Sequence, residues 1–248
     1  MNKEYTTEEL EKYFSVNRIK WEQFYPTEQK IINQLNIKNN TTILDVGCGC
    51  GGLGLALKER FGNTRYSGVE INTQAANSAV LMNKDAIIYK GDILELSQKI
   101  LKNKQFDIVF SLSCIDWNVE FEKSLNAIWQ HVLPGGYLMA TFRLTNKQTI
   151  NDINKSYQFI NYENKKKGEI ASYVVININD LLKYLDILNP SIINAYGYWG
   201  KPSLIAITPF EEICFTALFI QKRFLENDNK PLIKKLDFPI EILNSINK

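Results

Sequence analysis

The sequence predicts an α/β fold in which a doubly wound, mostly parallel sheet of seven strands carries an N-terminal helical lid. Three observations predict it. Short apolar strand-like runs alternate with helix-like segments from residue 41 onward, and a glycine-rich turn follows the first run. The 248 residues are enough to bury one large core, so we expect a single domain over residues 1–248.

The composition favours a protein of the cytoplasm. Hydrophobic residues make up 45% of the chain, and its 29 basic side chains nearly balance the 27 acidic ones. That near-neutral charge argues against a groove for nucleic acid. No apolar stretch reaches the ~18 residues that a membrane-spanning helix needs, and the polar, acidic N-terminus does not resemble a signal peptide.

The cysteines predict neither a disulfide framework nor a metal site. Four cysteines are too few to cross-link a chain of this length, and Cys48 and Cys50 form an isolated C-x-C. A zinc site would need Cys114 and Cys214 to converge on them, because His131 is the single histidine. We therefore expect reduced thiols, no metal, and a packing or surface role for the histidine.

Residues 1–40 are predicted to form the helical lid. Thr6 or Thr7 can cap a first helix, whose apolar positions recur at helical spacing. A second helix is expected to begin near Thr27, behind Pro26, and to bury Ile31, Ile32 and Leu35.

The alternating core is predicted over residues 41–143. Its strand-like runs are residues 42–46, 65–70, 86–89, 106–112 and 136–142. The helix-like segments between them are residues 52–60, 73–83, 94–102 and 119–132. Short apolar strands separated by helices are typical of a parallel sheet with helices on both faces.

The alternation of strand-like and helix-like segments is less regular at residues 144–178 and 226–248. Residues 144–178 are polar over most of their length and are predicted to be an insertion or cap, with one strand at residues 172–178. Residues 226–248 hold two prolines among charged side chains and are predicted to form a surface tail.

Residues 179–225, between these two segments, are predicted to close the fold. They contain a helix-like segment at residues 179–185 and strand-like runs at residues 191–197 and 213–221. We expect both runs to join the sheet, one of them antiparallel.

The most informative segment is the run TILDVGCGCGG at residues 42–52. An apolar strand containing Asp45 leads directly into four glycines, which let the backbone turn sharply and let a ligand lie against it without a Cβ in the way. A dinucleotide site has the spacing G-x-G-x-x-G and holds a pyrophosphate, which the anion of Asp45 would repel. The same anion would instead orient an ammonium group. The segment therefore favours a nucleoside that bears an amino acid over NAD.

The order D-x-G-x-G-x-G resembles the signature of class I S-adenosylmethionine-dependent methyltransferases. The likeness continues in chain order through SGVEIN at the second strand, GDI after the third, FDIVFSLSCIDWN at the fourth and LPGGYLMATF at the fifth. It covers residues 40–143. The cofactor that it implies is S-adenosylmethionine (SAM), with S-adenosylhomocysteine (SAH) as the product.

The resemblance also implies roles for the acids of the core. It places Glu70 on the ribose hydroxyls of the cofactor and Asp92 near the adenine amino group. The residues expected to bind the cofactor are Asp45, Gly47, Gly49, Gly51, Glu70, Ile71, Gly91, Asp92, Ile93 and Ser111.

The end of the fourth strand is expected to face the methyl group. Asp116 is the best-placed candidate for a catalytic base, and the alternative is that it caps the next helix. The sequence S-C-I-D-W-N differs from the N/D-P-P-Y type of motif found in DNA and protein amide methylases, which disfavours those substrates. Asp116 and Asn118 alone do not make a metal-dependent site of the catechol type.

The candidate substrate-binding residues come from four parts of the chain: Arg18, Tyr25, Trp117, Asn118, Arg143, Tyr198 and Trp199. Arg143, just past the fifth strand, is the best candidate to grip a phosphate or carboxylate. The aromatic residues of the stretch AYGYWGKPS are expected to form a loop that closes the pocket, or else the end of a hydrophobic hairpin. In similar methyltransferases a leading segment like the lid folds over the cofactor and forms part of the substrate wall, whereas the packing of an amphipathic helix on the sheet accounts for most of its aromatic residues.

The predicted function is methyl transfer to a small polar metabolite, on oxygen, by a monomer or homodimer. The stretches YPTE, SCIDWN and YGYWGKPS resemble methyltransferases of bacterial surface-polysaccharide and natural-product pathways. That resemblance implies a sugar, nucleotide-linked or phosphoramidate-type acceptor. Two alternatives are a methyltransferase that modifies RNA and a non-catalytic module that binds the cofactor for regulation.

Overall fold

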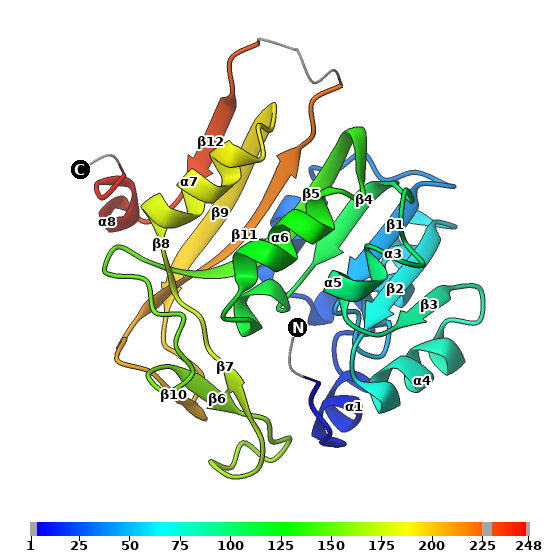
Figure 1. The fold of residues 1–248 in the computed structure, drawn as a ribbon, viewed down its shortest axis with the longest axis horizontal. Coiled ribbons are helices and arrows are strands. Elements are labelled where there is room, and N and C mark those ends of the chain that lie inside the picture. Colours follow the sequence, from blue (N-terminus) through cyan, green and yellow to red (C-terminus); the bar gives the residue numbers. More distant parts are fainter. Residues whose placement is uncertain (1–3, 225–229, 247–248) are drawn as a thin grey trace.

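The computed structural model describes residues 4–224 and 230–246, and a large mixed sheet forms its centre (Figure 1). In spatial order its strands are β12 (Ile233–Asp237), β9 (Ile192–Gly200), β11 (Ile213–Gln221), β5 (Val132–Thr145), β4 (Phe106–Ser111), β1 (Thr42–Val46), β2 (Arg65–Glu70) and β3 (Ile87–Lys90). β8 (Ile176–Asn177) pairs with β5 beside this row. Among these described strands only β11 is antiparallel to its neighbours, so the prediction of a mostly parallel α/β sheet is confirmed.

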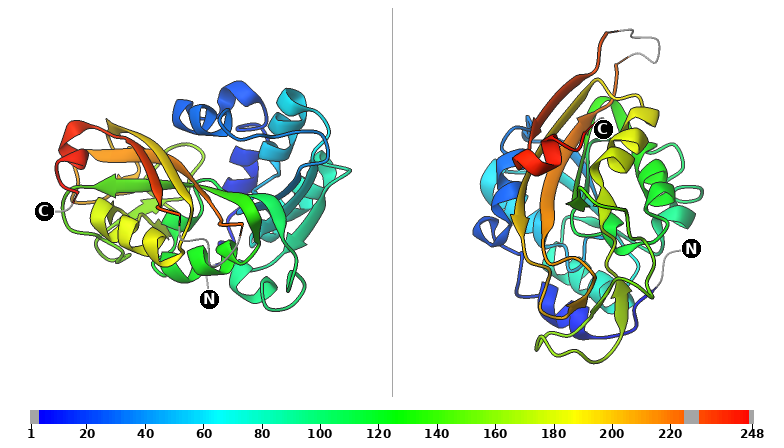
Figure 2. Two further views of the ribbon diagram at one scale, coloured as in Figure 1. Left: turned by 90° about the horizontal axis from the view of Figure 1, so that it is seen from above. Right: turned by 90° about the vertical axis from the view of Figure 1, so that its left-hand side faces the viewer.

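Helices cover both faces of the sheet. They are α2 (Pro26–Ile32), α3 (Gly52–Phe61), α4 (Thr73–Met82), α5 (Ile93–Leu96), α6 (Phe121–Trp129), α7 (Ile178–Ile187) and α8 (Ile240–Leu243). Because side chains alternate along a strand, Ile43 packs with α2 and α3 on one face, while its neighbour Leu44 packs with α6 and α7 on the other. The two layers of helices are separated by the sheet in the view from above (Figure 2).

The strand order reverses between β1 and β4. The chain leaves β1 toward β2 and β3, then returns to place β4 on the other side of β1. Crossovers that run in opposite directions leave a crevice outside the carboxyl ends of these two strands. The glycine-rich turn follows β1 at that point, which fixes where a ligand can bind.

The N-terminal segment crosses this crevice as α1 (Glu9–Phe14), the 3-10 helix η1 (Trp21–Gln23) and α2. The Thr7 hydroxyl accepts a hydrogen bond from the Glu9 amide, at the predicted start of the first helix. Ile31 and Ile32 are fully buried, as predicted, and the segment contacts α4, α3 and β11 in turn. The lid is therefore seated on the cofactor side of the core by its own apolar residues.

The predicted insertion contains a second, smaller sheet. β6 (Tyr157–Phe159) lies between β10 (Ala206–Ile207) and β7 (Ile170–Ser172), and both neighbours are antiparallel to it. Residues 173–175 separate β7 from β8, so the single strand predicted at residues 172–178 is wrong. Figure 1 shows this small sheet beyond one end of the large one, on the same side as α1.

The C-terminal region departs most from the prediction. Residues 230–246 do not form a plain surface tail, because β12 adds a strand beside β9 and Ile242 of α8 is fully buried. The large sheet therefore exceeds the seven strands predicted. Residues 225–229 and 247–248 of the predicted tail lie outside the described residues. Of the two predictions for the stretch AYGYWGKPS, the loop is wrong and the hairpin end is confirmed, because Tyr198 and Trp199 lie at the end of β9 where it pairs antiparallel with β11.

The contact between the lid and α3 supplies a test of how tightly the lid is seated. A Cβ on Gly52 would lie 2.1 Å from the carbonyl oxygen of Arg18. We expect Gly52→Ala to force the lid away, at a cost of about 1–3 kcal/mol, and to lower the Tm by at least ~2 °C. Thermal unfolding measures this.

Lys58→Ala is the matched control, because Lys58 lies on the same helix with an exposed ion pair that contributes little. An unchanged Tm for Gly52→Ala, equal to that of the control, would contradict the close packing of Arg18 on α3.

Candidate active site

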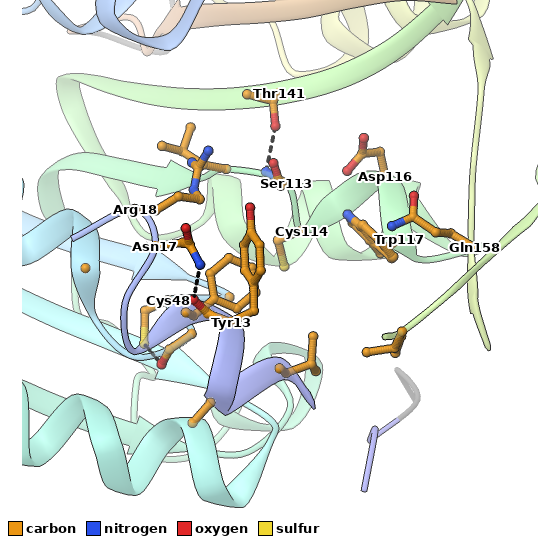
Figure 3. Close-up of a pocket in the computed structure, with 18 of the residues that line it drawn as sticks. Tyr13, Asn17, Arg18, Cys48, Ser113, Cys114, Asp116, Trp117, Thr141 and Gln158 are labelled. Carbon is orange, nitrogen blue, oxygen red and sulfur yellow. Dashed lines mark hydrogen bonds between the residues drawn. The ribbon is translucent and has the colours of Figure 1, made fainter. Parts of the chain in front are cut away.

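A cavity of about 570 Å³ lies at the carboxyl ends of β1, β2 and β4, between the lid and the small sheet (Figure 3). Its size is typical of a site for small molecules, which range over ~300–1,000 Å³. In Figure 3 Tyr13, Asn17 and Arg18 of the lid lie on one side, and Asp116, Trp117 and Gln158 lie on the other. The cavity is thus built from segments far apart in the sequence.

The glycine turn brings backbone to the cavity wall. Gly47 and Gly49 have φ of 77° and 55°, in the left-handed region that favours glycine. A Cβ on Gly47 would overlap the Cys114 side chain, and one on Gly49 would touch the Phe14 ring. Glycine is therefore required at both positions, and their bare backbone forms a glycine-lined cradle in the cavity wall. Gly51, also at φ 77°, lies outside the cavity, where a Cβ would meet Asn83.

Asp45 is buried beneath this turn and lines the cavity. Its carboxylate accepts a hydrogen bond from the Tyr66 hydroxyl at 2.7 Å. Burial raises the pKa of Asp45 to about 7, against the opposing effect of that hydrogen bond. A cation beside Asp45 would favour its ionised form.

Glu70 and Asp92 line the same side of the cavity. The Glu70 carboxylate accepts hydrogen bonds at 2.8 Å from the amides of Gly49 and Asn72, and burial raises its pKa. Asp92 begins α5 and accepts from the Leu94 amide. The residues Ile71, Gly91 and Ile93 also line the cavity. Ser111 does not, because its side chain is fully buried at the end of β4.

The methyl donor SAM has two positively charged groups, a sulfonium and an ammonium, and one negatively charged carboxylate. The cavity offers six acidic side chains against three basic ones, and a glycine-lined cradle without Cβ atoms. The acidic lining residues are Glu9, Glu28, Asp45, Glu70, Asp92 and Asp116, and the basic ones are Arg18, Arg143 and Lys201. The residues present therefore fit a cationic nucleoside cofactor.

Asp116 and Arg143 form a buried ion pair on the cavity wall. Asp116 lies in the 3-10 helix η2 (Ile115–Trp117), and Arg143 lies inside β5 rather than past its end. The Arg143 Nε donates to Asp116 Oδ2 at 2.7 Å. The expectation that Asp116 caps the next helix is wrong, because Glu120 occupies that position of α6.

Arg18 forms the second buried ion pair. Its two terminal nitrogens donate to both oxygens of Glu28, at 3.1 and 2.8 Å, and its guanidinium lies over the rings of Phe24 and Tyr25. Glu28 is fully buried. Both arginines that were expected to bind an anionic acceptor are thus neutralised by carboxylates of this chain.

The other predicted substrate residues divide into two groups. Tyr25, Trp117, Asn118 and Tyr198 line the cavity. Trp199 does not, because successive side chains of β9 point to opposite faces and its indole donates to Glu241 of α8. Its assignment to the substrate site is therefore wrong.

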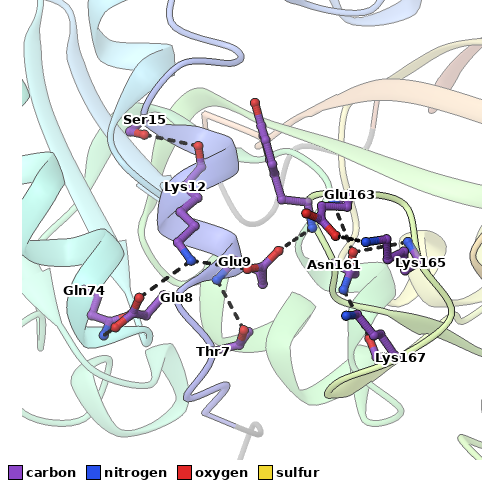
Figure 4. Close-up of polar contacts among 11 residues, drawn as sticks. Thr7, Glu8, Glu9, Lys12, Ser15, Gln74, Asn161, Glu163, Lys165 and Lys167 are labelled. Atoms are coloured by element: carbon purple, nitrogen blue, oxygen red, sulfur yellow. Dashed lines mark hydrogen bonds and ion pairs between the residues drawn. The ribbon is translucent and has the colours of Figure 1, made fainter.

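The lid and the small sheet hold each other over the cavity. Figure 4 shows Glu9 of α1 against the loop that contains Asn161 and Glu163, and Glu9 accepts from the Tyr162 amide at 2.6 Å. The Glu169 carboxylate accepts from the amides of Thr6 and Thr7. These contacts close one side of the cavity.

Several cavity residues were missed by sequence analysis. Tyr5 and Tyr173 line it, and burial raises the pKa of Tyr5 to about 12. Ser113 was not missed, because it lies in the segment after the fourth strand that was expected to face the methyl group. It has φ 51°, which is uncommon for a residue other than glycine, and its amide donates to the Thr141 hydroxyl at 2.6 Å. Tyr5 precedes the helical periodicity and Tyr173 lies in the irregular insertion, so no pattern marked either residue.

Neither the cysteines nor the histidine belongs to a metal site in the described residues. All four cysteines are free thiols, and no group of three His, Cys, Asp or Glu in residues 4–224 and 230–246 could hold a metal ion. His131 is buried and bonds to the Lys104 carbonyl and the Ser97 hydroxyl, away from the cavity. In the same ranges no helix is both long and apolar enough to cross a bilayer.

Comparisons with known proteins identify the class of the protein. Residues 44–138 match the family described as a methyltransferase domain. Phosphoethanolamine N-methyltransferase of Plasmodium falciparum is 26% identical over 92% of this chain and 85% of its own length. Trans-aconitate 2-methyltransferase of Deinococcus radiodurans is 28% identical over 39% of this chain and 35% of its own length.

A solved structure shows the same fold. It is phosphoethanolamine N-methyltransferase 2 of Haemonchus contortus in complex with phosphomonomethylethanolamine and SAH, with a TM-score of 0.56 and 15% identity over 78% of this chain. The chain spans 52% of the length of that structure. Together with the acidic cavity, the matched domain and the curated relatives indicate a SAM-dependent methyltransferase, and the solved structure shows the class I fold.

The raised pKa of Asp45 gives a prediction about cofactor affinity. We expect SAM to bind more tightly as the pH rises through 7, because the ionised carboxylate attracts its ammonium group and the protonated one does not. Below the pKa, affinity falls by up to about tenfold per pH unit. Calorimetric titration between about pH 6 and about pH 8 measures this.

Two variants assign the effect to Asp45. Asp45→Asn should remove the pH dependence, and Tyr66→Phe should move it to higher pH, because the lost hydroxyl stabilises the anion. A wild-type affinity that is constant over this pH range would show that Asp45 does not hold the cofactor's cation.

Proposed function

We propose that the protein transfers the methyl group of SAM to the nitrogen of a small polar amine. The observation that carries this proposal is the charge of the cavity, where carboxylates outnumber cationic side chains and both buried arginines are paired with acids. An acceptor with anionic groups alone would find few free cations there, whereas an acceptor that carries an ammonium group would be attracted by the carboxylates. The relative from P. falciparum, named for N-methylation of phosphoethanolamine, favours the same acceptor atom.

SAM supplies an electrophilic methyl group, and we assign its binding to the acids of the core. Asp45 holds the ammonium group, Glu70 the ribose hydroxyls and Asp92 the adenine edge. The glycine turn accommodates the amino-acid moiety of the cofactor, since Gly47 and Gly49 present backbone to the cavity.

Asp116 is the residue that we propose to take a proton from the acceptor. Its carboxylate is buried on the cavity wall, and burial raises its pKa against the opposing effect of Arg143. A carboxylate so raised is a better proton acceptor near neutral pH than an exposed one. Trp117, Asn118, Tyr25 and Tyr198 form the surrounding acceptor wall, and Asp116 also suits a hydroxyl acceptor, the class predicted from the sequence.

The cytoplasm is the proposed location, which the four free thiols support. We propose that the chain acts as a monomer or homodimer on a small molecule, with one domain that combines the lid, the core and the cap. The enclosure of the cavity by lid and small sheet favours a small acceptor over RNA, which would need an open, basic surface.

Methyl transfer from radiolabelled SAM tests the acceptor class. We expect transfer to ethanolamine or phosphoethanolamine and not to the matched alcohols ethylene glycol or glycerol phosphate. Transfer to the alcohols alone would overturn the nitrogen assignment in favour of oxygen. Transfer to transfer RNA alone would favour the RNA-modifying alternative. SAM binding without transfer to any acceptor would favour the regulatory module.

Asp116→Asn tests the base. We expect kcat to fall by about 10²–10⁴-fold, because the amide cannot accept the proton, while SAM affinity stays unchanged. Asp85→Asn is the control, since Asp85 is an exposed acid that pairs only with Lys58 at the surface among the described contacts. A kcat for Asp116→Asn equal to that of the control would rule Asp116 out as the base.

A further inference from the structure

Arg143 is enclosed by groups of this chain on its edges and on its faces. Its Nε donates to Asp116 Oδ2 at 2.7 Å, and its Nη2 donates to the Asp116 backbone carbonyl. The guanidinium carbon lies 3.8 Å from the ring centre of Tyr173 and 5.0 Å from that of Trp117. Arg143 therefore contacts one aspartate at two points while two aromatic rings hold its plane.

The other carboxylate oxygen of Asp116 lacks a partner. Oδ1 is buried and accepts no hydrogen bond from the described residues, although Asp116 lines the cavity. Buried polar atoms are nearly always paired, so an exception in a cavity indicates that a donor arrives with a ligand. The carboxylate thus has one oxygen fixed by Arg143 and one oxygen left to receive a proton donor.

We propose that Arg143 is a positioning residue, which turns Asp116 so that Oδ1 receives the N–H or O–H donor of the methyl acceptor. Arg143 itself does not bind the acceptor. This inference rests on the proposed function, because it assigns the orientation of the proposed base. It also replaces the role of anion binding that the sequence predicted for Arg143.

The small sheet completes this arrangement. The Asp116 carbonyl accepts a second hydrogen bond from the Val174 amide, at 3.1 Å. Tyr173, the residue before it, is fixed by two hydrogen bonds with Ser156, which connect the Tyr173 amide with the Ser156 carbonyl and the Ser156 hydroxyl with the Tyr173 carbonyl. The segment after β7 therefore places both a ring on Arg143 and an amide on Asp116.

Two charged groups on separate segments act on the ionisation of Asp116, Arg143 of β5 and Glu28 of α2. Two further titratable groups face Asp116, Cys114 ahead of η2 and Tyr173 after β7. Burial raises the pKa of Asp116, Arg143 lowers it and Glu28 raises it. Loss of the guanidinium must therefore raise it further, so that Asp116 becomes protonated at a higher pH.

The fluorescence of Trp117 reports the ionisation of Asp116 and needs no catalysis. The Trp117 signal is obtained by subtracting the emission of SAH-loaded Trp117→Phe from that of SAH-loaded wild-type protein, and it is followed as a function of pH. We expect a step that Asp116→Asn abolishes and that Arg143→Gln moves to higher pH. Arg60→Gln is the matched control, because Arg60 also lies over a tryptophan, Trp21, but on the exposed side of the lid. An unmoved step in Arg143→Gln would overturn the inference.

Kinetics separate positioning from acceptor binding. With ethanolamine and phosphoethanolamine as acceptors, Arg143→Lys should lower kcat for both by the same factor, up to about 100-fold, because lysine keeps the charge but loses the two-point contact. The KM values should change little. A rise in KM for phosphoethanolamine alone would show that Arg143 binds the phosphate and would overturn the inference.

Tyr173 supplies a second pair of variants that leaves both charges in place. Tyr173→Phe keeps the ring over Arg143 and should lower kcat less than Tyr173→Leu, which loses the ring and should lower it as Arg143→Lys does. Equal activity of the two would contradict the positioning role. If wild-type protein transfers no methyl group, the proposed function fails, while the Trp117 titration still tests whether Arg143 is paired with Asp116.

Discussion

The seating of the lid on the glycine turn is the constraint on which the cavity depends. The Arg18 carbonyl occupies space that any side chain at Gly52 would take, and the Phe14 ring lies against Gly49. Arg18 adopts φ 60° to reach this position, and its bidentate pair with Glu28 holds it there. A less favourable backbone conformation is thus offset by a buried ion pair and two aromatic contacts. Without this contact the cavity would lack one wall.

The same reasoning explains the charge of the cavity. A buried arginine without a carboxylate is costly, and each of the two here has one within hydrogen-bond distance. Each ion pair neutralises its arginine and its carboxylate, so Asp45, Glu70 and Asp92 are the acids that remain to face the ligand. The positive cofactor then compensates carboxylates that the fold has buried, and its charge opposes the rise that burial causes in the pKa of Asp45 and Glu70.

Much of the core could be predicted because its sequence is regular. The runs at residues 42–46, 65–70 and 213–221 became β1, β2 and β11 with the predicted bounds. The first and last are apolar segments, and the middle one follows in regular alternation with the helices of the core. The polar run of β12 gave no such signal, because most of its side chains are exposed beside the edge of the sheet. Strand β12 and the short strands of the cap are stabilised by tertiary pairing rather than by local pattern.

The site could be predicted as far as one segment specified it. The glycine turn and the three acids lie next to strands that periodicity located. The acidic partners of Arg18 and Arg143 could not be predicted from the sequence, because ion pairs between separate elements depend on the tertiary structure. Trp199 could have been excluded, since the two-residue period of a strand sends it and Tyr198 to opposite faces.

β12 also determines how the sheet ends. A bare outer strand offers unpaired amides and carbonyls to another chain, and lysine on such a strand opposes that pairing. β12 carries Lys234 and Lys235, and Lys234 is anchored to Asp186 of α7. The C-terminal strand therefore finishes the sheet with charge, which protects this flank of the molecule from edge-to-edge aggregation.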